Sequence, residues 1–141
     1  MKRYLILLCA FLLAFSITGI TYTAKKKTQE LVDHDLDQFD KDMRYAFVSS
    51  LMNDPEEYLH QTMRTDGVFY SFQNGQGRIH DVIYISDTMG CCQKGLLLVL
   101  QDGQTRPANG TMTEIKGTLE YACEEDHREI SLSSAVICSE P

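Results

Sequence analysis

The sequence predicts an α+β protein in which a long N-terminal helix, made of a membrane segment and an amphipathic extension, packs on an antiparallel β-sheet. Three observations lead to this fold class. An unbroken apolar run extends from Tyr4 to Ala24, helical periodicity continues as far as Met52, and β-branched and aromatic residues become frequent after Gly67. Helix-forming and strand-forming segments are therefore separated along the chain, which is typical of α+β proteins.

Residues 1–24 are predicted to form a transmembrane anchor or an uncleaved signal. About 20 apolar residues match the hydrocarbon thickness of a bilayer at ~1.5 Å of rise per residue. The run exceeds the roughly 7–15 residues of an ordinary signal-peptide core, and the lysine triplet 25–27 follows it directly. Both features favour retention over cleavage, so we expect residues 4–24 to bind the lipid bilayer as a signal-anchor.

Residues 25–66 are predicted to contain an amphipathic helix, from about Thr28 to Met52, and a short second helix. Apolar side chains recur at steps of three and four along the first helix. The side chains of this predicted interaction stripe are Val32, Leu36, Phe39, Met43 and Phe47. The stripe is expected either to pack on the sheet or to bind a partner helix. Asp54 is placed to cap the second helix, Pro55 to Arg64.

Residues 67–141 are predicted to form an antiparallel β domain cross-linked by disulfides. The candidate strands, rich in β-branched and aromatic residues, are Val68–Gln73, Arg78–Ser86, Leu96–Gln101, Thr113–Ala122 and Glu129–Ile137. Asn74-Gly75 and Asp102-Gly103 provide turn residues at two junctions. Strict alternation of apolar and polar residues from Thr113 to Cys123 predicts a strand with one buried face and one solvent-exposed face. The wholly apolar run from Leu96 to Leu100 instead predicts a central strand covered on both faces.

Cys91, Cys92, Cys123 and Cys138 are predicted to form disulfides outside the cytosol. They make an even set in a small domain and lack the CxxC or CxH spacing of a zinc site. A regular hairpin over residues 113–137 would hold Cys138 about 33 Å from Cys123, whereas a disulfide requires Cα atoms within ~7 Å. Either the last segment departs from that hairpin and brings the two together, or one thiol stays unpaired.

The acidic composition argues against nucleic acid as a partner. The chain carries 13 Lys and Arg against 20 Asp and Glu, a formal net charge of −7, which repels phosphate backbones.

We expect no metal or cofactor: Asp33, Asp35 and Asp37 begin like an EF-hand loop, but Gln38 replaces its glycine. The four histidines share no spacing with a nucleophile, so no catalytic residues are predicted.

The order of these segments resembles the layout of type IV pilins and minor pilins. An apolar helix continues as an amphipathic rod, a sheet follows, and Tyr121-Ala122-Cys123 precedes Cys138 by a short terminal loop. The resemblance implies that Tyr4 to Met52 is the long helix, that residues 68–122 are the sheet, and that Cys123 and Cys138 are bonded. The basic-Gly-Phe processing junction of that family and its early glutamate are missing from this sequence.

Three functions follow as hypotheses. The leading one is a membrane-anchored assembly or binding module, with protein partners or self-assembly and with a pilin-like subunit of an envelope filament or secretion apparatus as its most specific version. This single-pass protein would hold its C-terminal domain on the extracytoplasmic side. One alternative is an extracytoplasmic thiol-redox or metal-dependent enzyme centred on Cys91-Cys92. The other is a cytosol-facing membrane adaptor oriented by the lysine triplet.

Overall fold

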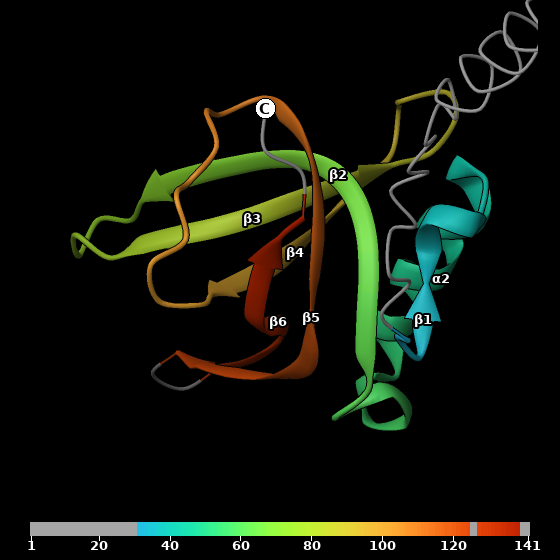
Figure 1. The fold of residues 1–141 in the computed structure, drawn as a ribbon, viewed down its shortest axis with the longest axis horizontal. Helices are drawn as coiled ribbons and strands as arrows, with labels where there is room; N and C mark the ends of the chain where they lie inside the picture. Colours follow the sequence, from blue (N-terminus) through green and yellow to red (C-terminus); the bar gives the residue numbers. More distant parts are fainter. Residues whose placement is uncertain (1–30, 125–126, 139–141) are drawn as a thin grey trace, which may run out of the picture. The chain divides into compact units, whose positions relative to one another are not determined.

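The computed structural model describes residues 31–124 and 127–138. The chain divides into two compact units, Met1–Glu30 and Leu31–Pro141, and the described residues all belong to the second. The elements in chain order (Figure 1) are β1 (His34–Asp35), η1 (Leu36–Gln38), α2 (Lys41–Asn53), η2 (Pro55–Tyr58), β2 (Thr62–Gln73), β3 (Ile79–Ser86), β4 (Gln93–Leu100), β5 (Thr111–Glu124) and β6 (His127–Ile137).

Five strands form a closed barrel. Their order is β2-β3-β4-β6-β5, and the pairing of β5 with β2 closes the ring. Within the barrel only β4 and β6 run parallel. The long connection after β4 returns β5 to the side of β2, which makes a Greek key, and a five-stranded Greek-key barrel is the architecture of the OB-fold. The predicted α+β fold with a helix on an antiparallel sheet is therefore wrong: the described chain is mostly β and has one 13-residue α-helix.

The strand β2 closes the barrel because it is long enough to pair on both sides. Its residues from Thr62 to Phe69 pair with β5, and those from Val68 to Gln73 pair with β3. Figure 1 shows it as a long, curved strand. At Gly67 the neighbouring strand approaches so closely that a Cβ atom would lie 2.7 Å from the carbonyl oxygen of Tyr84. Glycine at this position therefore permits the curvature.

Aspartates break the predicted rod of residues 28–52 into short elements. Asp40 is the N-cap of α2, and its carboxylate accepts a hydrogen bond of 2.8 Å from the backbone N–H of Met43. Asp33 accepts a bond of 2.7 Å from the backbone N–H of Thr62, which ties the segment before η1 to the start of β2. Short acidic side chains favour caps and backbone contacts over helix interiors. Asp40 therefore starts a separate helix, and Asp33 anchors the chain to the barrel.

The core lies inside the barrel and continues to η1 and α2. Alternate residues of each strand point inward, including Met63 and Phe69 of β2 and Leu119 of β5, all with 0% exposure. Leu36 of η1 and Val48 and Leu51 of α2 join the same buried cluster. Residues on both sides of the predicted boundary at 66/67 therefore contribute to one buried cluster.

The sequence located the strands more accurately than it located the helices. All five predicted strands are present, and the alternation in β5 is confirmed because Ile115, Gly117 and Leu119 are buried. The prediction that Leu96–Leu100 is covered on both faces is wrong, since Val99 is 49% exposed. The predicted helix from Pro55 is a single 3-10 turn, after which β2 begins at Thr62. Backbone pairing with β5 extends the strand into residues that resemble a helix by sequence alone.

The predicted single-pass membrane protein with a transmembrane signal-anchor is not supported. In residues 31–124 and 127–138, no helix is both long and apolar enough to cross a bilayer. The segment 4–24, to which this role was assigned, lies outside the described residues.

Candidate functional site

The loop between β3 and β4 brings together two thiols and a carboxylate, side chains that can bind a metal ion or take part in thiol chemistry. It runs from Asp87 to Cys92, and it folds back on itself because the backbone N–H of Asp87 donates to the carbonyl oxygen of Cys92 at 3.2 Å. Gly90 adopts a φ of +69°, a conformation that side chains disfavour, and its N–H donates to the carbonyl of Asp87. This tight return places Asp87 beside both cysteines, four and five residues later.

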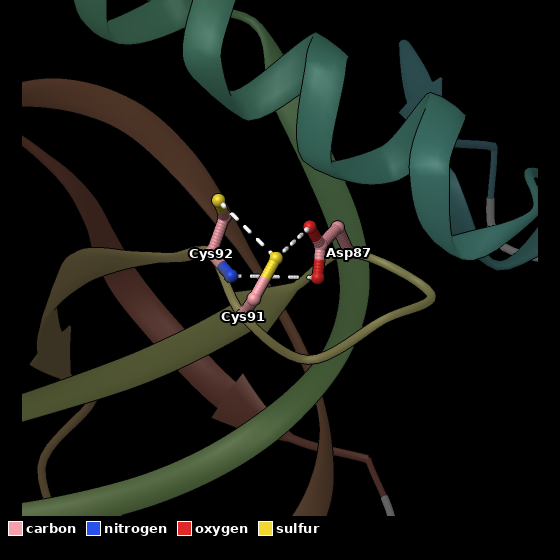
Figure 2. A group of neighbouring side chains, drawn as sticks. All are labelled: Asp87, Cys91 and Cys92. Carbon is pink, nitrogen blue, oxygen red and sulfur yellow. Dashed lines mark hydrogen bonds between the residues drawn. The ribbon is translucent and has the colours of Figure 1, made fainter.

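Figure 2 shows the sulfur of Cys91 between the carboxylate of Asp87 and the sulfur of Cys92. The thiol of Cys91 donates to Asp87 Oδ2 at 3.3 Å, and the two Sγ atoms are 3.7 Å apart. The backbone N–H of Cys92 donates to Asp87 Oδ1 at 3.4 Å. One potential ligand atom from each residue lies within 4.8 Å of the other two, and both cysteines are exposed. We call these three residues the Cys–Asp cluster.

The carboxylate controls the protonation of the neighbouring thiol. Hydrogen bonding to Asp87, followed by the contact with Cys92, raises the pKa of Cys91 to about 11. Desolvation of Asp87 opposes its ionisation, but hydrogen bonds from the Cys91 thiol and from backbone N–H groups together outweigh it and lower the pKa of Asp87. The raised pKa keeps the Cys91 thiol protonated at pH 7. Since the thiolate is the nucleophile, this environment weighs against Cys91 as the nucleophile of a thiol-redox reaction.

The register of the last hairpin separates the cysteines that the pilin resemblance would pair. Cys123 pairs with Arg128 at one end of the β5–β6 ladder, and Ile137 pairs with Ile115 at the other. The backbone N–H of Cys138 donates to the carbonyl of Glu114, so Cys138 lies about 30 Å along the strand from Cys123 at ~3.3 Å per residue. This far exceeds the ~7 Å that a disulfide spans between Cα atoms.

The four predicted disulfide cysteines therefore do not come together at one place. Cys91 and Cys92 carry free thiols in the loop after β3, and Cys138 lies at the end of β6. The side chain of Cys123 lies outside the described residues. Disulfide formation by these cysteines stays a prediction, but the topology that would close a terminal loop is not available to the barrel.

The predicted interaction stripe packs mainly on the barrel. Leu36 is fully buried, and Phe39 and Phe47 lie half-buried against the core. Val32 is also half-buried, whereas Met43 is 55% exposed because the chain leaves the helical path before α2 begins. Of the two uses expected for the stripe, the structure shows packing on the sheet.

An apolar surface that the sequence did not predict lies on the outside of β2, β3 and β4. It continues onto β5, and we call it the outer face. Its residues are Val68, Tyr70, Phe72, His80, Val82, Tyr84, Gly95, Leu97, Val99 and Met112. Ring contacts join its strands: the Tyr70 and Tyr84 centroids are 5.7 Å apart, edge to face, and the Phe72 and His80 rings stack at 5.5 Å.

The sequence features that could have revealed the outer face are the apolar run in β4 and the apolar residues around Phe72. In Val68–Phe72 four of the five side chains are apolar or aromatic, although the barrel interior accepts only one of the two alternating sets. The signal for the Cys–Asp cluster was the short Asp87–Cys92 segment between two predicted strands. The vicinal cysteines are evident in that segment, whereas Asp87 joins them only through the fold of the loop.

Comparison with models of protein families, with curated proteins and with solved structures finds no significant match to this chain. The function must therefore be argued from the chain's own geometry.

Proposed function

We propose that this protein is a non-catalytic assembly module that binds a second copy of itself through the outer face. The observation that carries the proposal is the exposure of large apolar side chains on one contiguous surface of the barrel. Phe72 is 49% exposed and Met112 is 58% exposed, and Tyr70 and Val99 are also exposed. Monomeric proteins rarely leave apolar patches of this kind open to water, and such patches commonly mark sites of association.

The charge distribution favours a second copy as the partner. The outer face contains no Asp, Glu, Lys or Arg, although the chain as a whole has a formal net charge of −7. Two copies of an acidic protein repel each other least where their surfaces carry no charge. Interfaces between identical subunits are also more apolar than other interfaces, and a two-fold axis would place the same patch on both sides.

Close packing of side chains from neighbouring strands fixes the shape of the outer face. Gly95 lets the Tyr84 ring lie close over β4, since a Cβ atom there would be 3.0 Å from Tyr84 Cε1 and from Val82 Cγ1. Val82 is consequently only 6% exposed although it points out of the barrel. At the edge of the outer face, beside Gly95 and Leu97, the surface is hollowed with a volume of about 350 Å³, and Arg128 and Glu129 also line this hollow.

Sedimentation velocity of the full chain over a wide concentration range tests the proposal. We expect a reversible dimer in the wild type. Phe72→Lys should weaken it about tenfold or more, because a two-fold axis brings two unpaired ammonium groups into one apolar interface. Met43→Lys is the matched control, since it adds the same charge at a similarly exposed apolar residue of α2.

Two results would overturn the proposal. One is a wild-type protein that remains monomeric at several hundred micromolar. The other is an equal loss of dimer in Phe72→Lys and Met43→Lys, which would assign the effect to net charge. Thermal unfolding of both variants shows whether each retains the fold of the wild type.

A further inference from the structure

We infer that the Cys–Asp cluster is a binding site for a thiophilic divalent cation, with zinc as its natural probe. Two sulfurs and one carboxylate oxygen from a single six-residue loop lie within 4.8 Å of one another. Soft sulfur ligands select zinc-like cations over magnesium or calcium, which prefer all-oxygen sites. The inference is independent of self-association, because the loop contributes no residue to the outer face.

The spacing of the ligand atoms fits a tetrahedral zinc ion. With Zn–S bonds of ~2.3 Å and a Zn–O bond of ~2.0 Å, tetrahedral angles place two sulfurs ~3.8 Å apart and sulfur and oxygen ~3.5 Å apart. The observed separations are 3.7 Å between the two Sγ atoms and 3.3 Å between Cys91 Sγ and Asp87 Oδ2. Two of the distances between ligand atoms that a tetrahedral zinc site requires are therefore already present in the protein.

The loop is fixed at both ends, which limits the reorganisation needed for binding. The backbone bonds between Asp87, Gly90 and Cys92 close the loop. On the other side, the N–H of Thr88 donates to the carboxylate of Asp42 in the first turn of α2 at 2.8 Å. This second carboxylate also adds negative charge next to the cluster, which favours a cation.

Binding exchanges protons for the metal ion. Zn²⁺ replaces the two thiol protons: it binds two thiolates and the carboxylate, and two H⁺ are released. The net charge of the cluster stays at −1, since two positive charges leave and two arrive. Both cysteines are exposed, so the ion has an entry path and a solvent molecule fills its fourth position.

The test is a calorimetric titration of the reduced full chain with Zn²⁺ after chelator treatment. We expect one ion per chain, release of about two protons, and weaker binding at lower pH because protons compete for the thiolates. Titration with Co²⁺ should produce a thiolate-to-metal charge-transfer band, and Mg²⁺ should not compete. Cys92→Ser and Asp87→Asn should each weaken Zn²⁺ binding at least tenfold, as expected when a ligand is removed.

Cys138→Ser is the matched control, because it removes an exposed cysteine at the end of β6 and leaves the cluster intact. Equal loss of binding in Cys138→Ser and Cys92→Ser would overturn the inference, as would full retention of zinc in the Cys91→Ser/Cys92→Ser double variant. Absence of binding to the reduced wild type at tens of micromolar zinc would do the same. Circular dichroism of each variant separates ligand loss from unfolding.

Discussion

Leu36 offers a sharp test of how the N-terminal segment packs, because a stripe that binds a partner helix would leave this side chain exposed in the monomer, whereas the observed fold buries it. Its side chain is fully buried in η1 and belongs to the same cluster as Val48, Leu51 and Phe69. Leu→Ala at a fully buried site costs roughly 3–5 kcal/mol when the surroundings stay rigid. Since η1 is a short element that can shift inward, we expect Leu36→Ala to lower the free energy of unfolding by about 2–4 kcal/mol.

The assay is urea unfolding followed by far-ultraviolet circular dichroism. With an m-value of about 2 kcal/mol/M, the expected loss moves the midpoint by roughly 1–2 M. Met43→Ala removes a similar side chain from the same predicted stripe, but Met43 is 55% exposed, so its effect should stay within about 0.5 kcal/mol. If Leu36→Ala were no more destabilising than Met43→Ala, the packing of residues 31–40 on the barrel would be refuted.

Three further predictions concern the backbone and the acidic residues. Gly67→Ala should destabilise the barrel by about 2 kcal/mol or more in the same urea assay, because the new Cβ would meet the carbonyl oxygen of Tyr84; an unchanged midpoint would contradict this. Asp40→Ala should cost about 1 kcal/mol through loss of the α2 cap, and Asp40→Asn should recover most of it. The ion pair with Arg64 lowers the pKa of Asp35, so its stabilisation is present above the unfolded pKa near 3.9 and is lost as pH falls through the lower folded value. Asp35→Asn should therefore lose less stability than the wild type between pH 5 and pH 2, and parallel pH profiles would count against this assignment.

The pH dependence of the free energy of unfolding also contains a contribution of opposite sign, from Asp37. Burial raises the pKa of Asp37, with a further contribution from Glu114, so the ionised Asp37 opposes folding and its protonation stabilises the fold as pH falls. Asp33 behaves like Asp35, because hydrogen bonds from the backbone and side chain of Thr62 lower its pKa. The acid limb should thus show a small gain before the loss that begins near the unfolded pKa of the aspartates.

Local sequence determined the five barrel strands and the turn between β2 and β3. Alternation in β5 identified its buried face, and Asn74 begins the turn between β2 and β3, where its side chain accepts bonds from Gln76 and Arg78. These features depend on interactions within a few residues, so a pattern in one segment suffices to predict them. The same local reasoning failed for residues 31–52, where periodic apolar residues suggested one continuous helix although the chain forms several shorter elements.

Only the tertiary structure decided what those aspartates do, how the sheet closes and which side of it faces water. Asp35 pairs with Arg64 and Asp33 with Thr62, each 29 residues later, and the pairing of β2 with β5 joins segments about 50 residues apart. An apolar strand looks the same in sequence whether both of its faces are covered or one remains open. Closure of the barrel settles this for β4 by placing Leu96 and Leu98 inside and leaving Val99 on the outer face, because the interior of a small barrel holds only one of the two alternating sets of side chains.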